Sequence, residues 1–270
     1  MLIETLSTFP HMYDSVMGES MMKRAQEKGI LEFRAHDLRD WTHDRHRTTD
    51  DDPYGGGAGL VMKCDPIFEA VEAILGKEFV EAKLAAAPPQ ADSQQAPQIV
   101  FLAPQGRPFD DAYADKLAAA DHLLFICGHY EGIDERVYTL ADHVISLGDY
   151  VLTSGELASM VVIDAAVRKL PGVLGAAEGP VDESFTSGLL EYPQYTRPAD
   201  FRGMAVPEVL TSGNHAAIAR WRREQSLART AAGRPDLIAA AEAAGRLTPA
   251  DQKFLKLLEP ASTGAAEGVS

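Results

Sequence analysis

The stretch HLLFICGHYEGIDERV (residues 122–137), followed by HVISLGDYVLTSGE (143–156), contains the pattern that decides the fold of this chain. Each segment opens with a short apolar run, 122–127 and 143–148, of the length and composition of a buried strand. A helix is predicted to start near Ile133, and another is predicted over residues 156–170. With IVFLAP (99–104) and a predicted helix over 112–120, these repeated strand–helix units predict an α/β fold with a mainly parallel sheet.

The pattern on either side of this region predicts two domains. Towards the N-terminus we expect strands over 2–8 and 31–38, helices over 13–28 and 66–79, and a long loop over 39–59. After residue 174 the pattern changes, and helices are predicted over 214–232, 235–244 and 248–258. We therefore expect an α/β domain over 1–174 with a mobile insertion at 84–97, a linker at 175–184, a helical domain over 185–258, and a disordered tail at 259–270.

Composition limits the possible classes of protein. The 270 residues include 46% hydrophobic residues, enough for a sizeable core, and the formal charge of −15 argues against a nonspecific nucleic-acid coat protein. Only Cys64 and Cys127 could form disulfides, and they have no zinc-knuckle spacing. No signal peptide and no apolar run of membrane-spanning length is visible, so we expect a cytoplasmic protein.

Glycines follow three of the predicted strands. Ligands of parallel sheets bind at the carboxyl ends of the strands, where glycine lets the main chain approach closely. A cofactor of the size of adenosine, held largely by main-chain groups, would suit these positions. The alternative is that each glycine only makes a turn. The glycines concerned are Gly106, Gly128, Gly132, Gly148 and Gly155.

Five separated motifs carry a family resemblance. In chain order they are THDRHRTTDD, PYGGGAGLVM, GHYEGIDERV, LGDYVLTSGELAS and SGNHAAIARWRREQSLART. Together they closely resemble the bacterial tRNA (guanine-N1)-methyltransferases of the SPOUT class, over residues 1–258. The resemblance implies a deep C-terminal trefoil knot in the α/β domain, a small all-helical domain after it, and a homodimer. General rules would have excluded a knot, since knots are nearly absent from proteins.

The resemblance also implies an activity. The methyl group of S-adenosyl-L-methionine would be transferred to N1 of the guanosine at position 37 of tRNA, immediately 3′ of the anticodon. The partner would be the anticodon stem-loop, and Mg²⁺ would be required, with no ligand set that the sequence identifies.

The knot motifs assign the residues around the methyl donor. An acidic side chain there, Glu131 or Asp149, would favour the sulfonium cation, although Asp149 could equally cap a helix. Ser154 stands where the family commonly has glycine, and it fits if its φ is negative. The expected donor-binding residues are Leu102, Pro104, Gly128, Tyr130, Glu131, Leu147, Gly148, Asp149, Tyr150, Val151, Leu152 and Gly155.

Methylation of guanine N1 requires a base, because that nitrogen carries a proton at neutral pH. The segment GPVDESFTSG aligns Glu183 with an aspartate that has this role in the family, and Asp182 is the alternative. Arg168 matches an arginine that would stabilise negative charge developing on O6. Without the resemblance, the two acids would be read as solvated linker residues and Arg168 as a helix-end cation.

Local charge predicts where RNA binds. Between residues 195 and 235 there are seven arginines and three acids, a net charge of +4 in an acidic protein, and Trp221 lies among them. A second basic patch lies in the loop that contains Arg39 and His43. The alternative is a solvated helix face whose arginines pair with acids. The expected tRNA-binding residues are Arg45, His46, Arg47, Ser184, Arg197, Arg220, Arg222 and Arg223.

The sequence leaves three other functions open. A metal-dependent hydrolase could use His43, His46 and the acids beside them, but H-x-x-H in a basic loop is a weak signal. A noncatalytic RNA-binding module on the same fold would not bind the methyl donor. A ribose methyltransferase of the same class would lack the motif NHAAIARWRREQS, which is present.

Overall fold

A computed structural model describes residues 1–85, 95–174 and 183–258. The chain divides into two compact units, Met1–Gly179 and Pro180–Ser270. Most of the predicted insertion, Asp182 and the predicted tail lie outside the described residues. No helix in the described part of the chain is long and apolar enough to cross a membrane.

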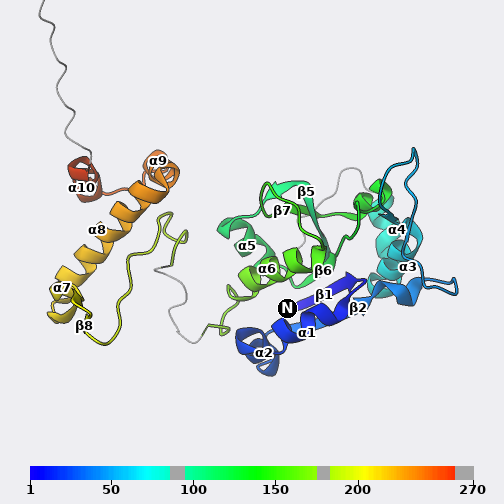
Figure 1. The fold of residues 1–270 in the computed structure, drawn as a ribbon, viewed down its shortest axis with the longest axis horizontal. Coiled ribbons are helices and arrows are strands. Elements are labelled where there is room, and N and C mark those ends of the chain that lie inside the picture. The colour runs from blue at the N-terminus through cyan, green and yellow to red at the C-terminus, as the bar shows by residue number, and fades with distance from the viewer. Residues whose placement is uncertain (86–94, 175–182, 259–270) are drawn as a thin grey trace, which may run out of the picture. The chain divides into compact units, whose positions relative to one another are not determined.

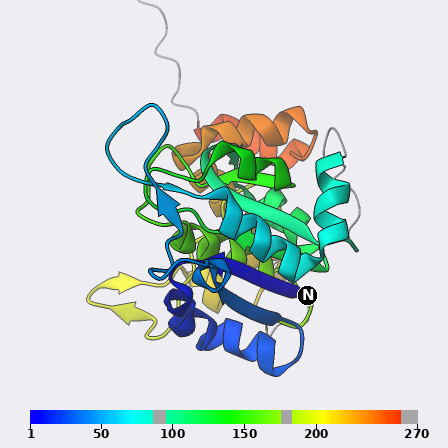
Figure 2. The same cartoon turned by 90° about the vertical axis from the view of Figure 1, so that its right-hand side faces the viewer.

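The first unit contains a five-stranded sheet in the order β2-β1-β6-β5-β7, and every pair of neighbours is parallel. This confirms the predicted α/β fold with its parallel sheet. Figure 2 shows β1 and β2 side by side at the N-terminal end of the chain. The strands are β1 (Leu2–Ser7), β2 (Glu32–Asp37), β5 (Gln98–Pro108), β6 (His122–Ile126) and β7 (His143–Ser146).

Alternating side chains of the strands fill two separate cores. In β6, Leu123 and Phe125 belong to one core, while Leu124 and Ile126 belong to the other, as the two-residue period of a strand requires. Helices α5 (Asp111–Ala118) and α6 (Gly155–Val167) cover the first face. Helices α3 (Cys64–Leu75) and α4 (Lys77–Ala85) cover the second, and Figure 1 shows the two pairs on opposite sides of the sheet.

Several connections differ from the prediction. The helix expected over 13–28 is interrupted after residue 17: η1 (Pro10–Tyr13) leads into α1 (Asp14–Met17), and α2 (Ser20–Glu27) follows. The helix expected near Ile133 is the 3-10 helix η3 (Glu135–Leu140). The helix expected over 66–79 ends at Gly76, whose φ of +96° favours glycine, and α4 then begins.

The loop expected over 39–59 has more structure than its composition indicates. Its first residues belong to the 3-10 helix η2 (Leu38–Trp41), and it contains β3 (Asp50–Asp51), which pairs antiparallel with β4 (Val61–Met62). Met62 also forms a parallel bridge to Ile133, so the end of this loop is held beside the segment that follows β6.

The second unit contains mainly helices around a small core of Leu189, Leu227 and Ala241. Its two-stranded β8–β9 hairpin was not predicted, while α8, α9 and α10 match the predicted helices within about two residues. The elements are β8 (Asp200–Phe201), β9 (Met204–Ala205), α7 (Glu208–Thr211), α8 (His215–Gly233), α9 (Pro235–Ala243) and α10 (Pro249–Leu258).

Candidate active site

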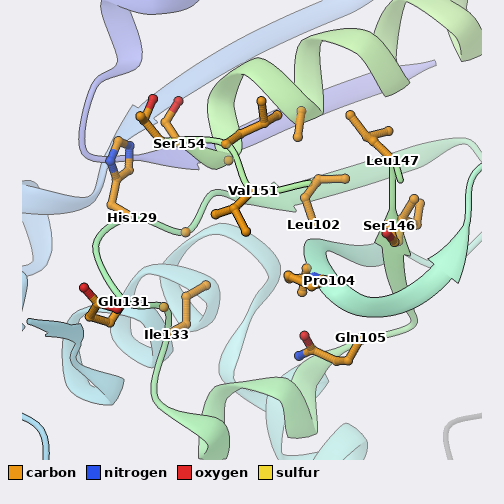
Figure 3. A pocket seen from close by; sticks show the side chains of 18 of the residues that line it. Leu102, Pro104, Gln105, His129, Glu131, Ile133, Ser146, Leu147, Val151 and Ser154 are labelled. Atoms are coloured by element: carbon orange, nitrogen blue, oxygen red, sulfur yellow. The ribbon is translucent and has the colours of Figure 1, made fainter. Parts of the chain in front are cut away.

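A cavity of about 400 Å³ lies where the irregular middle of β5 meets the loops that follow β6 and β7. Figure 3 shows His129 and Glu131 on one side of it and Pro104 and Gln105 on the other. This is the edge at which parallel sheets usually bind ligands. The cavity lies within the size range of small-molecule sites.

Two glycines let the main chain of neighbouring loops touch beside this cavity. The Gly155 N–H donates a 2.8 Å hydrogen bond to the Gly128 carbonyl. A Cβ on Gly155 would lie 2.7 Å from the Gly128 nitrogen and 3.0 Å from the Cys127 Cα. Since backbone atoms cannot give way as a flexible side chain does, the first turn of α6 reaches this position only with glycine there.

Ser154, the departure from the family pattern, fits without backbone strain. Its φ of −156° and ψ of 147° are extended and open to any residue, as the prediction required. Ser154 is the N-cap of α6 but makes no side-chain cap hydrogen bond. Its Oγ is buried and has no hydrogen-bond partner in the described part of the chain.

The structure brings together most of the residues expected around the methyl donor. Eleven of the twelve line the cavity, and Asp149 is exposed in the turn between β7 and α6. Asp149 is not the cap of α6 either, because Ser154 has that place. The eleven are Leu102, Pro104, Gly128, Tyr130, Glu131, Leu147, Gly148, Tyr150, Val151, Leu152 and Gly155.

A buried polar network beside the cavity was missed at the sequence level. Glu156, in the first turn of α6, is fully buried. One of its carboxylate oxygens accepts a hydrogen bond from Ser7 Oγ, and the other lies 2.6 Å from Nε2 of His129. A buried carboxylate requires such partners, and the helix N-terminus also favours its charge. The only sequence signal was an acid directly after Gly155.

A second buried network supports the same helix. The Tyr13 hydroxyl lies 2.6 Å from Ser159 Oγ and 3.1 Å from Cys127 Sγ. Burial raises the pKa of the Cys127 thiol to about 12, so this cysteine stays protonated at neutral pH. Ser159 Oγ also donates to the Glu156 carbonyl, which links the two networks within α6.

The expected catalytic residues belong to different units. Arg168 is the half-buried C-cap of α6 in the first unit. Glu183 is half-buried in the second unit, and Asp182 lies outside the described residues.

The expected tRNA-binding residues fall into two kinds. Arg45, His46, Arg47, Arg197, Arg220 and Arg222 are exposed. Arg223 instead makes two hydrogen bonds to Asp251, at 3.0 and 2.8 Å, which join α8 to α10. Ser184 Oγ accepts from the Glu191 N–H at 2.9 Å. Arg223 and Ser184 therefore have structural contacts of their own. Arg47 and Arg220, although exposed, also pair with Asp40 and Glu224, so part of the set behaves as the alternative interpretation expects.

The metal-site interpretation of the basic loop finds no support in the geometry. His43 Nε2 lies 2.7 Å from Glu69, and Asp44 accepts hydrogen bonds from the main chain of His46 and Thr48. The hydrogen bond from the Thr48 N–H is the main reason why the pKa of Asp44 is lowered to about 2. Within residues 1–85, 95–174 and 183–258, no group of three His, Cys, Asp or Glu residues is placed to hold a metal ion.

A parallel sheet with a glycine-rich cavity at its edge defines an α/β protein of the kind that usually binds small ligands at that edge. The sequence model of the family described as tRNA (Guanine-1)-methyltransferase TrmD matches residues 1–240. The chain belongs to this family.

Relatives at about half identity cover nearly the whole chain. A tRNA (guanine-N(1)-)-methyltransferase of Limosilactobacillus reuteri is 52% identical over 242 residues, which are 90% of this chain and 91% of the relative. Proteins of the same name from Symbiobacterium thermophilum (52% identical, 95% of this chain and 97% of the relative) and Geotalea uraniireducens (50% identical, 96% and 97%) are equally similar.

Proposed function

We propose that this chain transfers the methyl group of S-adenosyl-L-methionine to N1 of the guanosine at position 37 of tRNA. The observation that carries the proposal is a family match over residues 1–240 in a chain whose strand-end cavity has the expected lining. As a member of the family, the chain is a tRNA (guanine-N1)-methyltransferase. The donor, the position of the guanosine and the residues below are the finer parts of the proposal.

The cavity suits the methyl donor in size and chemistry. Its glycines leave main-chain groups accessible, and apolar side chains such as Leu102 and Ile133 can pack against an adenine ring. Glu131 is an exposed acid on the cavity wall, where it would favour a sulfonium cation. When bound, the donor supplies a methyl group made electrophilic by its positive sulfur.

The chain's own residues would handle the proton and the charge. In our proposal the carboxylate of Glu183, or that of Asp182, takes the N1 proton as the nitrogen lone pair attacks the methyl carbon. The carbon–sulfur bond breaks at the same time, and its electrons stay on sulfur. The Arg168 guanidinium stabilises negative charge on O6 of the guanine. The exposed arginines, among them Arg220 and Arg222, contact tRNA phosphates.

The knot and the homodimer are part of the proposal. Support for the knot comes from the family alone, because the close approach of Gly106 to the backbone of Ile145 reflects only the parallel pairing of β5 and β7. Support for the dimer comes from the family alone, as does the magnesium requirement, which stays a prediction without a ligand set. A cytoplasmic location likewise stays a prediction.

Methyl incorporation from labelled S-adenosylmethionine into unmodified tRNA transcripts tests the proposal. Transcripts with guanosine at position 37 should accept the methyl group, and matched transcripts with adenosine there should not. Transfer to neither, by folded protein that binds the donor, would favour the noncatalytic alternative. Transfer to a ribose hydroxyl would indicate the ribose methyltransferase alternative.

Replacement of the proposed base tests its assignment. Glu183→Gln should lower kcat by about 100-fold or more, the size expected for loss of a general base, while the Kd of the donor stays unchanged. Asp182→Asn is the matched control and should change kcat by less than about threefold. If Asp182→Asn abolishes transfer and Glu183→Gln does not, the two roles are exchanged.

A further inference from the structure

A second cavity, of about 430 Å³, lies in the first unit where β1 and β2 end. None of the donor-binding or catalytic residues proposed above contributes to it. It is lined by Thr8, Phe9, Pro10, His11, Met12, Asp37 and Arg39.

The wall of this cavity carries an aromatic ring with a cation on it. Phe9 is 45% exposed, although most large apolar side chains of this unit are buried. The guanidinium carbon of Arg39 lies 5.3 Å from the centre of the Phe9 ring. An exposed aromatic ring beside an arginine is the usual way in which proteins stack an unpaired nucleobase.

The ring is held in place by the polar network of the donor cavity. The Phe9 N–H donates a 2.8 Å hydrogen bond to Ser7 Oγ, and Ser7 in turn donates to the buried Glu156. Arg39 Nη1 donates to the Thr8 carbonyl. The platform is therefore pre-organised, which lowers the entropy that binding must overcome.

His129 joins the two cavities. It lines the donor cavity, and its ring centre lies 4.9 Å from that of Phe9. A base stacked on Phe9 would therefore lie next to the methyl-transfer site but not in it. A nucleotide that neighbours the methylated one would have this position.

Both arginines near the platform are paired with acids: Arg39 Nη1 lies 3.5 Å from Asp37, and Arg47 forms an ion pair with Asp40. Arg47 donates from Nε to the Arg39 carbonyl at 3.1 Å, and its side chain is 49% exposed. Only Arg39 is placed over the ring, so the subsite depends on stacking against Phe9 rather than on net positive charge.

We propose that Phe9 and Arg39, with His129 at their edge, bind an unstacked nucleobase of the substrate tRNA that neighbours the methylated guanosine. The inference rests on the proposed function, because the ligand is the substrate tRNA. It adds a second base subsite to the donor cavity and the basic helix.

Binding of full-length tRNA transcript to full-length protein tests the subsite. Phe9→Ala should raise the Kd of tRNA about tenfold, the usual effect of losing one base–aromatic stack. Phe9→Leu, which keeps apolar bulk without a ring, should weaken binding similarly, and Phe9→Tyr should stay within about twofold of the wild type. Arg39→Gln removes the cation over the Phe9 ring. Its charge-matched control is Arg24→Gln, which removes an exposed arginine on α2.

A double-mutant cycle identifies the base. An abasic nucleotide at position 36 or 38 should raise the Kd of tRNA for the wild type about tenfold. For the Phe9→Ala protein, whose Kd is already raised, the same abasic nucleotide should raise the Kd little further. The melting temperature and the Kd of S-adenosylmethionine should stay as in the wild type. The subsite is disproved if Phe9→Leu binds tRNA normally, or if every abasic transcript weakens both proteins equally. Methylation of guanosine 37 by the wild type is measured separately, so that failure of the subsite is distinguished from failure of the proposed function.

Discussion

The cavity of the first unit is formed by closely packed backbone, whereas the surface of the arginine-rich helix α8 in the second unit is formed by exposed charged side chains. The cavity depends on backbone in close contact, such as Gly155 against Gly128, above two buried cores. Helix α8 presents long charged side chains, with Arg220 80% exposed, around a core of only a few buried residues. The first region should tolerate almost no added volume, and the second should respond mainly to charge and salt.

The largest effect on donor binding should follow from one added methyl group. Gly155→Ala forces α6 away from Gly128, because the new Cβ would lie 2.7 Å from a backbone nitrogen. We expect the Kd of S-adenosylmethionine to rise about 10- to 100-fold, matching the roughly 1–3 kcal/mol that overpacking costs. Calorimetric titration would measure it.

Gly233→Ala is the matched control from the second region. Its added Cβ meets only a Leu190 methyl group, at 3.9 Å. This variant should bind the donor as the wild type does. Equal donor affinity in the two alanine variants would contradict the contrast between the regions.

Acid should weaken the first unit before the second. His143 is buried between Gln98 Oε1 at 2.8 Å and the Tyr113 hydroxyl at 2.9 Å, and burial lowers its pKa to about 4. The unfolded chain binds this proton near the ordinary pKa of about 6.5, so stability falls as pH drops from about 6.5 to about 4. The loss could reach about 3 kcal/mol.

Chemical denaturation at several pH values would measure this loss. His143→Gln, which keeps a hydrogen-bonding side chain but cannot titrate, should flatten the profile between those limits. An unchanged slope in the variant would show that other groups cause the acid sensitivity.

Salt concentration should affect tRNA binding by helix α8 but not donor binding in the cavity. Arg220→Gln and Arg222→Gln should each raise the Kd of tRNA several-fold at low salt, and each should reduce the slope of log Kd against log salt by about one. The KM of the donor should not respond. Filter binding of tRNA between low and moderate salt gives the slope, and parallel lines for variant and wild type would exclude phosphate contacts by these residues.

The smallest effect should come from the ion pair inside the second unit. The Arg223 guanidinium lowers the pKa of Asp251, so the pair stabilises the unit above the ordinary aspartate pKa, and this contribution is lost as pH falls through the lowered value. Arg223→Gln should cost about 1 kcal/mol at neutral pH, since Arg223 is partly exposed. Thermal unfolding at pH 7 and pH 3 should show the difference shrinking; a constant difference would point to packing alone.

Local signals predicted most of the architecture. The apolar runs of β1, β6 and β7 lie within a residue or two of their predicted places, because a buried strand of a parallel sheet is apolar on both faces. Breaks were harder to predict. Gly18 and Gly76 interrupt helices whose hydrophobic spacing continues across them. Because hydrophobic periodicity contains no information about a change of chain direction, it predicted one continuous helix in each place.

The site was predictable only where a motif named its residues. Eleven of the proposed donor contacts line one cavity, but Ser7, His129 and Glu156 were missed because their contacts join segments up to 149 positions apart. No pattern within one segment contains that information. Similarly, the sequence could not show that Arg223 pairs with an acid on another helix, Asp251, whereas Arg220 pairs only with Glu224 on its own helix and stays 80% exposed.

The bond between Ser7 and Glu156 has a consequence for synthesis of the chain. A ribosome adds about 5–20 residues per second, so Ser7 at the end of β1 is synthesised roughly 7–30 s before Glu156, its carboxylate partner. During that interval the end of β1 and Phe9 lack the group that fixes them. A nascent chain stalled before residue 156 would therefore expose an unfinished sheet edge, which is where chaperones should bind it.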